Sequence, residues 1–241
     1  MELPLGSDPR TDILRRAQAA LIGEYGRIVR PPDKRRDPVW TLVQGVIGAR
    51  SKTIVSNTST DRLIADYGSW EAVAKAPLEE FTEILSIQTF PELSAQRLKD
   101  CLTAIVEKRG AVDLRHLSNL PTEEAMDWLE TLPGIARKIS AQIMNTSTFD
   151  RPVMVIEGHH RRIMQRMGLV PPKADTLRAY NALMPVLPEE WSAADMDEHH
   201  LLLKKLGQSH CRPSRTDCAA CPVRPDCETG RAKASAGPAA G

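Results

Sequence analysis

The chain has 241 residues, a formal net charge of +1 and only 4% aromatic residues. This length is enough for one large hydrophobic core or two small ones, and a core built mainly from Leu, Ile, Val, Ala and Met suits helices. No apolar run reaches the ~20 residues that cross a bilayer, and the first residues lack the basic-then-apolar pattern of a secretory signal. We therefore expect a soluble, cytoplasmic protein with no membrane partner.

Helical periodicity of the apolar residues dominates the chain. The helices that it predicts span 11–29, 37–49, 60–68, 69–76, 94–110, 122–132 and 192–210. Asp37 and Pro38 form an N-cap and first-turn signal, and Ser192 fits a cap for a helix that stops near Gly207. No alternating run is long enough for a strand. Residues 228–241 are small and polar, which predicts a disordered tail.

Basic residues gather in two places despite the near-neutral total charge. Between Arg10 and Arg36 there are eight basic residues against three acidic ones, and no acid interrupts the segment from His159 to Arg166. Such patches follow the phosphate backbone in nucleic-acid-binding proteins. A solvated charged face produces the same pattern, so charge alone leaves both interpretations open.

Four of the five cysteines lie in one polar segment near the C-terminus, with the spacing C-x6-C-x2-C-x5-C. They are Cys211, Cys218, Cys221 and Cys227. A structural zinc site usually has two close pairs of ligands, and only one such pair is present; a disulfide is rare inside cells. Four thiolates around an iron–sulfur cluster suit the wider gaps, with zinc as the alternative. Cys101 stands alone on a predicted helix and is expected to be a buried core thiol.

The cysteine spacing resembles the cluster signature of the endonuclease III branch of the helix-hairpin-helix (HhH-GPD) DNA glycosylases. Three upstream segments resemble the same branch in the right order, and they read WTLVQGVIGARSKT, LETLPGIARKISAQIMN and RPVMVIEGHHRRIMQRMGLV. The resemblance covers roughly residues 37–227 and implies a 4Fe–4S cluster on the four cysteines. That cluster would be mainly structural, holding a loop that presents Arg212 and Arg215 to phosphates.

The same resemblance implies an all-α fold of two domains, with the active site in the cleft between them. Residues 37–150 would form a helical barrel that includes the helix-hairpin-helix at about 124–147. Residues 1–36 and 151–227 would form the iron–sulfur domain, followed by the disordered tail. We expect the protein to be a monomer.

The segment LPGIARK resembles the family's phosphate-binding hairpin. A tight turn exposes the N–H groups at the start of the second helix, and those donors favour a phosphate. The resemblance makes Leu132, Gly134, Ala136 and Arg137 DNA-binding residues. The family usually has a second glycine at the position of Ala136. Because alanine adopts a positive φ only at a cost, an altered hairpin is expected.

Lys138 and Glu157 stand where the family has its two catalytic groups. Lys138 would be a partly desolvated amine that attacks the sugar C1′ and forms a Schiff base, which favours base removal followed by β-elimination. Glu157 would stabilise an oxocarbenium-like sugar and help to activate the lysine. The family's residue at this second position is normally aspartate. Glutamate is a poorer N-cap than aspartate, so capping does not explain the change. A solvated lysine and a helix-start charge are the plain alternatives.

Four more residues are assigned to DNA contact by the resemblance. Arg50 falls where the family has a glutamine that fills the gap left by a flipped nucleotide. Phe90 falls where an apolar wedge enters from the opposite side, with core packing as an equal alternative. His159 and Arg162 match a histidine and a basic residue that follow the carboxylate, and for His159 a structural role is the favoured interpretation.

The sequence therefore predicts a DNA base-excision repair glycosylase with abasic-site lyase activity on oxidised pyrimidines. Its partner would be double-stranded DNA with damaged bases or abasic sites, on the nucleoid if the cell is bacterial. Two alternatives are an abasic-site lyase with weak or altered glycosylase activity, because Glu157 is nonstandard, and a non-catalytic binder of distorted DNA. The presence of both Lys138 and a carboxylate counts against the binder.

Overall fold

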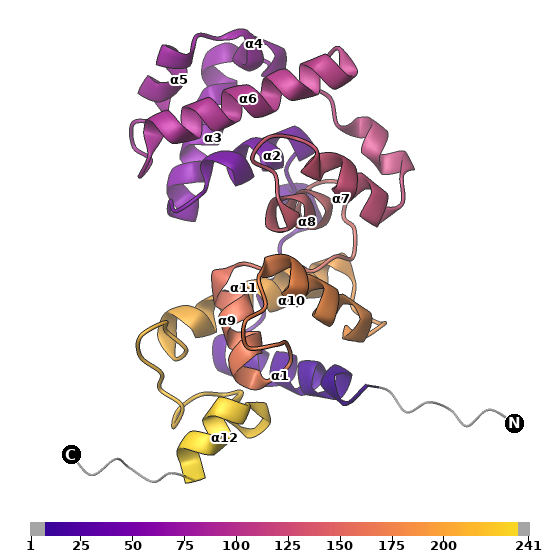
Figure 1. Cartoon of the computed structure of the whole chain (residues 1–241), viewed down its shortest axis with the longest axis vertical. Coiled ribbons are helices and arrows are strands. Elements are labelled where there is room, and N and C mark those ends of the chain that lie inside the picture. The colour runs from indigo at the N-terminus through magenta and orange to yellow at the C-terminus, as the bar shows by residue number, and fades with distance from the viewer. Residues whose placement is uncertain (1–7, 236–241) are drawn as a thin grey trace, which may run out of the picture. The chain divides into compact units, whose positions relative to one another are not determined.

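A computed structural model describes residues 8–235 (Figure 1). The chain divides into two compact units: the terminal unit joins Met1–Pro31 to Pro152–Gly241, and the central unit is Pro32–Arg151. Helices form the regular structure of both units, and over the described residues extended segments pair only at isolated bridges. The all-α fold predicted from the sequence is confirmed. No helix within residues 8–235 is long and apolar enough to cross a membrane.

The central unit is built around α2, against which α3, α6 and α8 pack. Its helices are α2 (Pro38–Ile47), α3 (Thr53–Tyr67), α4 (Trp70–Lys75), α5 (Leu78–Ile84), α6 (Pro91–Arg109), α7 (Thr122–Glu130) and α8 (Arg137–Thr146). Asp37 caps α2 as predicted, because its Oδ1 accepts hydrogen bonds from the N–H groups of Val39 at 2.8 Å and Trp40 at 3.1 Å. Nearly every residue of α2 is buried, so its one amide side chain, Gln44, must find partners inside the unit.

The terminal unit packs α11 against α1 and α9. Its helices are α1 (Pro9–Tyr25), α9 (Gly158–Met167), α10 (Thr176–Leu183), α11 (Ala193–Ser209) and α12 (Glu228–Ser235). Ser192 begins α11 with a capping box: its Oγ accepts from the N–H of Asp195, and the Asp195 carboxylate accepts from the N–H of Ser192. The apolar face of α11, with Leu202 and Leu206, is fully buried. This packing supports α9 along its length.

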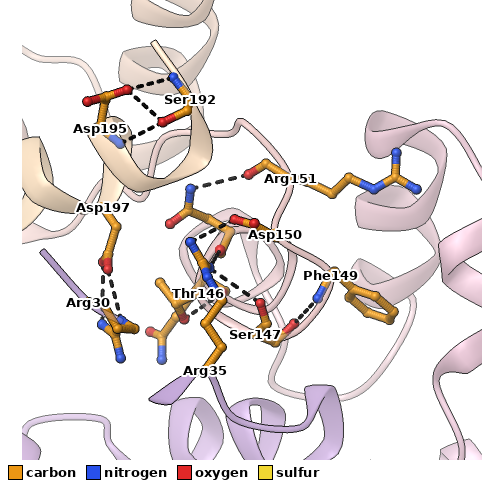
Figure 2. A network of polar contacts seen from close by, with 12 residues as sticks. Arg30, Arg35, Thr146, Ser147, Phe149, Asp150, Arg151, Ser192, Asp195 and Asp197 are labelled. Carbon is orange, nitrogen blue, oxygen red and sulfur yellow. Dashed lines mark hydrogen bonds and ion pairs between the residues drawn. The ribbon is translucent and has the colours of Figure 1, made fainter. Parts of the chain in front are cut away.

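The chain passes from one unit to the other at residues 31–32 and again at 151–152. Polar contacts hold the segments near these boundaries to their own units (Figure 2). In the terminal unit, the Arg30 guanidinium donates to the Asp197 carboxylate at 2.9 Å. In the central unit, Arg35 pairs with Asp150 at 2.7 Å and also donates to the backbone carbonyl of Asn145. The Arg35 side chain is only 5% exposed, so these acceptors meet the hydrogen-bonding requirement of a buried charge.

One helix end differs from the sequence prediction, which ran to residue 29. Helix α1 stops before Gly26, which has φ +73° and whose N–H bonds back to the carbonyl of Ile22 at 2.9 Å. Helix α11 continues past Gly207 to Ser209. Gly207 lies inside the helix, and its missing side chain makes room for His159 of α9. Glycine marks a helix end in the first case and a close contact in the second.

The structure differs from the predicted disordered tail, because Glu228–Ser235 form α12. The N–H of Arg231 bonds to the carbonyl of Cys227 at 2.9 Å, and the N–H of Gly230 lies 3.4 Å from the Cys227 sulfur. A Cβ at Gly230 would lie 3.3 Å from Arg224, so the glycine allows the close approach. Helix α12 therefore depends on contacts with the cysteine segment, which composition does not reveal. Residues 236–241 of the predicted tail lie outside the described residues.

Cys101, the cysteine outside the cluster segment, lies on α6 and is fully buried. Burial, with a smaller effect of the neighbouring Asp100, raises the pKa of its thiol to about 12. The thiol therefore stays protonated and unreactive at neutral pH. The prediction that Cys101 is a core thiol is confirmed.

Candidate active site and cysteine pocket

The hairpin joins α7 to α8 through a turn at residues 131–136. Gly134 has φ +80°, a conformation that favours glycine. Ala136 is the N-cap of α8 with φ −126° and ψ 172°, which is ordinary extended backbone. The altered hairpin expected from Ala136 is therefore not found, since the turn places no positive φ at that residue. Gly134 and Ala136 are both exposed.

Two of the hairpin residues predicted to contact DNA have side chains engaged inside the central unit. Leu132 is 2% exposed and belongs to the core. The Arg137 side chain is 11% exposed, and its guanidinium pairs with carboxylates of α7, at 2.8 Å from Glu123 and 2.9 Å from Glu130. Arg137 thus braces the second helix of the hairpin against the first, and we leave its side chain out of the proposed DNA contact.

Lys138 is half-buried in the first turn of α8, and its amine donates a hydrogen bond to Gln142 Oε1 at 2.8 Å. Ile135 and Ile143 are buried, in keeping with the helical periodicity of this segment. Gln142 Nε2 in turn donates to Gln44 Oε1 on α2 at 2.7 Å. The amine is thus held at one end of a chain of side-chain hydrogen bonds. The sequence signal for Gln44 is a single amide side chain within the mostly apolar helix α2.

Glu157 is the N-cap of α9, and its Oε1 accepts hydrogen bonds from the N–H groups of His159 at 2.8 Å and His160 at 3.1 Å. The longer side chain of glutamate thus folds back onto the helix start and caps it. Burial acts to raise the pKa of the carboxyl, but the N–H donors and nearby histidines hold it below its usual value. Glu157 is therefore ionised at neutral pH.

His160 and His199 are buried behind this cap, with ring centroids 5.6 Å apart. Burial lowers the pKa of His160 to about 3, and it lowers the pKa of His199 well below its usual value. His160 Nδ1 lies 3.1 Å from the carbonyl oxygen of Val155, which it can meet only as a donor. Both rings are neutral at neutral pH, so neither is poised to act as a general acid. His160 instead bonds to Val155 in the segment before α9, and His199 Nδ1 lies 2.7 Å from Gln18 Oε1 of α1.

His159 and Arg162 contact α11 and the cysteine segment within the terminal unit. Arg162 Nη2 donates to the carbonyl oxygens of Cys211 at 2.8 Å and Gly207 at 3.1 Å, and it lies 3.0 Å from His159 Nδ1. Because a guanidinium has no acceptor, His159 Nδ1 is the acceptor in this hydrogen bond. These contacts support a structural role for both residues, and their contact with DNA stays a prediction.

The position of His159 depends on Gly207, where a Cβ would lie 2.4 Å from His159 Nδ1 and 2.7 Å from its Cβ. We expect Gly207→Ala to lower the free energy of unfolding by about 1–3 kcal/mol, because overpacking outweighs the higher helix propensity of alanine. Urea unfolding followed by circular dichroism measures this change.

Gly23→Ala is the matched control for that substitution. Gly23 is also a helical glycine of the terminal unit, but a Cβ there would meet nothing within 4 Å. Its variant should be as stable as the unmodified protein or more stable, since alanine is the better helix former. Equal stability of the Gly207 and Gly23 variants would show that the His159 ring moves aside at no cost.

Arg50 and Phe90 lie side by side on exposed loops of the central unit. The guanidinium carbon of Arg50 is 5.7 Å from the centroid of the Phe90 ring, and Thr89 Oγ1 donates to the Arg50 carbonyl at 3.1 Å. Phe90 is 41% exposed and Ile87 is 57% exposed, which argues against core packing of the phenylalanine. Arg50 has φ +61°, which is uncommon for a residue other than glycine. The structure thus brings the two predicted lesion-contacting residues together.

All four clustered cysteines line one pocket of the terminal unit, with residues of α9, α11 and α12 around them. In residues 8–235, no three His, Cys, Asp or Glu side chains are arranged to hold a metal ion. Burial, reinforced by the other three cysteines, raises the pKa of Cys221 to about 11. Four thiols thus line one pocket of the terminal unit. This donor set fits a multi-iron cluster, in which each iron takes a separate thiolate.

Arg166 also enters this pocket, although no sequence motif singled it out beyond the basic run of α9. Its Nη1 donates to the Cys211 sulfur at 3.1 Å and to the carbonyl oxygen of Arg212 at 2.8 Å. Arg212 and Arg215 are exposed on the cysteine segment, and Arg212 Nε also donates to the carbonyl oxygen of Gln208 at 2.8 Å. Arg166 therefore holds the backbone that carries the exposed arginines.

Residues 43–189, more than half of the chain, match the family described as HhH-GPD superfamily base excision DNA repair protein. Endonuclease III of Bacillus subtilis (strain 168) is 26% identical over 196 residues, which cover 81% of this chain and 83% of that protein. The Transcriptional activator DEMETER of Arabidopsis thaliana is 29% identical over 171 residues. That match covers 66% of this chain but only 9% of the length of DEMETER.

Solved structures show the same fold at low identity. A non-covalent Endonuclease III–DNA complex has a TM-score of 0.73 at 20% identity, covering 93% of this chain and 98% of that chain. A thermostable thymine-DNA glycosylase has a TM-score of 0.71 at 15% identity, covering 93% of this chain and 100% of that chain. Because the family match covers more than half of the chain, the chain belongs to the HhH-GPD superfamily of base excision DNA repair proteins.

Proposed function

We propose that this protein is a DNA glycosylase with abasic-site lyase activity in base-excision repair. It acts as a cytoplasmic monomer on double-stranded DNA that contains an oxidised pyrimidine or an abasic site. The observation that carries the proposal is Lys138, a half-buried and hydrogen-bonded amine at the start of the second hairpin helix in a chain of this family. An Arabidopsis thaliana relative, 24% identical, bears the name DNA glycosylase/AP lyase ROS1, which supports the same pair of reactions.

In the proposed reaction, the neutral amine of Lys138 attacks C1′ of the damaged nucleotide, and the bond from C1′ to the base breaks as the base leaves with a proton. Transfer of a proton from the nitrogen to the ring oxygen then breaks the bond from C1′ to that oxygen, which opens the sugar ring and produces a protonated Schiff base. At an existing abasic site, the same Schiff base forms from the sugar aldehyde with loss of water. Removal of a C2′ proton expels the 3′ phosphate and cleaves the strand.

Glu157 is the proposed catalytic carboxylate. Its lowered pKa keeps it ionised at neutral pH, and a fixed negative charge stabilises the positive charge that develops on the sugar as the base leaves. Gly134 and Ala136 of the exposed hairpin turn are the proposed phosphate contacts, and Arg50 and Phe90 are the proposed contacts with the distorted base pair. Each of these four residues is exposed.

A second candidate function is an abasic-site lyase with weak glycosylase activity. Glu157 Oε1 accepts hydrogen bonds from two backbone N–H groups, which fixes the carboxylate at the helix start. This arrangement favours the second candidate. A panel of duplexes that each carry one lesion separates the candidates. Cleavage at an oxidised pyrimidine and at an abasic site is expected. Cleavage at the abasic site alone would favour the lyase, and binding without cleavage would favour a non-catalytic binder of distorted DNA.

We also propose that Cys211, Cys218, Cys221 and Cys227 hold a 4Fe–4S cluster. The four thiols in one pocket support this assignment, and the proposed role of the group is to hold the cysteine segment in shape. The exposed Arg212 and Arg215 would then face DNA phosphates. No step of the proposed reaction requires electron transfer from the cluster.

Iron content tests this assignment. Protein purified without oxygen should absorb light at about 400 nm and contain about four irons per chain. Cys221→Ser should lose the absorbance and weaken binding to abasic DNA, because a ligand of the cluster is gone. Cys101→Ala is the matched control and should keep its iron, since Cys101 is buried in α6 of the other unit. Stoichiometric zinc without iron would contradict the proposal.

A further inference from the structure

Side chains of the central unit form one continuous chain of hydrogen bonds that ends at Lys138. Lys138 Nζ donates to Gln142 Oε1 at 2.8 Å, and Gln142 Nε2 donates to Gln44 Oε1 at 2.7 Å. Gln44 Nε2 donates to Ser56 Oγ at 2.9 Å, and this hydroxyl donates to the carbonyl oxygen of Thr53 at 3.1 Å. We call Gln142, Gln44 and Ser56 the amide relay.

The direction of the amide relay is set at its far end. The hydroxyl hydrogen of Ser56 points to the carbonyl of Thr53, so the Ser56 oxygen accepts from Gln44. Each amide then offers its oxygen to the next group towards Lys138. A flipped Gln142 amide would place two donors against each other at the lysine. Gln142 therefore presents an acceptor to the amine.

The amide relay lies inside the central unit and is held there by helix packing. Gln44 is 8% exposed and Ser56 is 1% exposed. Helices α2 and α8 approach closely at Gly45, where a Cβ would lie 2.8 Å from Ile139 Cγ2. This approach brings Gln44 to 2.7 Å from Gln142, although they are 98 residues apart in the chain. A buried amide is costly without partners, so packing alone gives α2 no reason to carry a glutamine.

We propose that Gln142 and Gln44 are positioning residues, and that the amide relay holds the Lys138 amine in place for its attack on C1′. This inference rests on the proposed function, because it concerns the same amine. The far end of the relay is the first turn of α3, directly after the loop that carries Arg50. The nucleophile and the proposed lesion-contacting loop are thus anchored to the same part of the structure.

The relay fixes the orientation of the amine as well as its place. One N–H of Lys138 points at Gln142, so the lone pair of the neutral amine takes one of the remaining tetrahedral directions. Loss of this bond removes a contact that orients the amine, and a misplacement of about 1 Å can cost on the order of 100-fold in rate. Because the relay carries no charge, it orients the amine without favouring the ammonium form as a carboxylate would.

The test is the single-turnover rate of borohydride trapping, measured with the full chain in excess over a duplex that contains a pre-formed abasic site. Gln142→Leu and Gln44→Leu are each expected to lower this rate by on the order of 10-fold or more. Affinity for a duplex with a tetrahydrofuran analogue of the abasic site should not change. Gln96→Leu is the matched control: Gln96 is exposed on α6, its amide donates to Asp100 at 2.7 Å, and its variant should trap at the unmodified rate.

Two further variants separate positioning from folding. Each single leucine substitution leaves a buried amide without its partner, whereas the Gln44→Leu, Gln142→Leu double variant removes both amides. The double variant should regain thermal stability and still trap slowly. Gln142→Glu keeps an acceptor beside the amine but adds a charge that favours the ammonium form. It should shift the pH profile of trapping to higher pH, which a purely structural role would not do.

The outcomes distinguish the relay from the proposed function. Unmodified trapping rates in both leucine variants, with no trapping by Lys138→Ala, would overturn the amide relay alone. Recovery of the trapping rate together with stability in the double variant would also overturn it, because only folding would then be affected. Trapping by Lys138→Ala at the unmodified rate would overturn the proposed function and the relay with it.

Discussion

Lys138→Ala is expected to abolish borohydride trapping of this protein on DNA that contains an abasic site. Borohydride delivers hydride to the Schiff base and converts the imine into a stable secondary amine, so trapping requires the amine of the nucleophile. Alanine is the best helix former, and α8 should persist in the variant. The fraction of protein that migrates with the DNA in a denaturing gel measures the effect, and it should fall to background together with strand cleavage.

Lys138→Arg and Lys52→Ala complete this experiment. Arginine keeps the positive charge but does not lose its proton to become a nucleophile, so DNA affinity should be retained while trapping is lost. Lys52 is an exposed lysine of the same unit at the start of α3, and its alanine variant should trap normally. Undiminished trapping by Lys138→Ala would move the nucleophile to the N-terminal amine or to another lysine.

Glu157→Gln is expected to slow base release by about 100-fold to 1,000-fold, because it removes the charge that stabilises the sugar cation and keeps the shape of the side chain. Affinity for lesion-containing DNA should stay level or rise, since an anion near the phosphates is gone. The amide oxygen can still accept the cap hydrogen bonds, but loss of the charge at the start of α9 should cost about 0.3–1 kcal/mol in unfolding free energy. Single-turnover base release and urea unfolding measure the two effects separately.

Glu157→Asp gives the sharper result. Aspartate is the better N-cap, so stability should hold or increase. The carboxylate withdraws by about 1 Å, and base release should fall on the order of 100-fold if the backbone is adapted to glutamate. Higher activity on a lesion of the panel would show instead that glutamate is a tolerated defect. If neither variant changes the cleavage of any lesion, Glu157 is a helix cap and has no catalytic role.

Features of the sequence that act over a few residues were predictive. Asp37 and Ser192 cap α2 and α11 as expected, because a capping side chain bonds to N–H groups only two or three residues away. The order and spacing of the motifs indicated the family that the comparisons confirm. Exposure of Phe90 and Arg50 on neighbouring loops was not predictable in the same way, since residues 49–52 and 86–90 meet only in the folded unit.

Two sequence expectations differ from the structure, because backbone geometry decides one of them and contacts with another segment of the chain decide the other. Ala136 needs no positive φ, since the turn places that conformation at Gly134. Helix α12 forms where composition suggested disorder, and it contacts the cysteine segment, where the N–H of Gly230 lies 3.4 Å from the Cys227 sulfur.

By itself, the sequence determined the all-α class, the family, the hairpin and the positions of Lys138, Glu157 and the cysteine motif, because all of these depend on residue type and spacing along the chain. Only the tertiary structure decided the hydrogen bond between Gln44 and Gln142, the residue that accepts from Lys138, because 98 residues of sequence separate the two glutamines. Hydrogen bonds between helices depend on how closely the helices pack. The glycine that lets α2 approach α8 looks, in a periodicity pattern, like any other small residue.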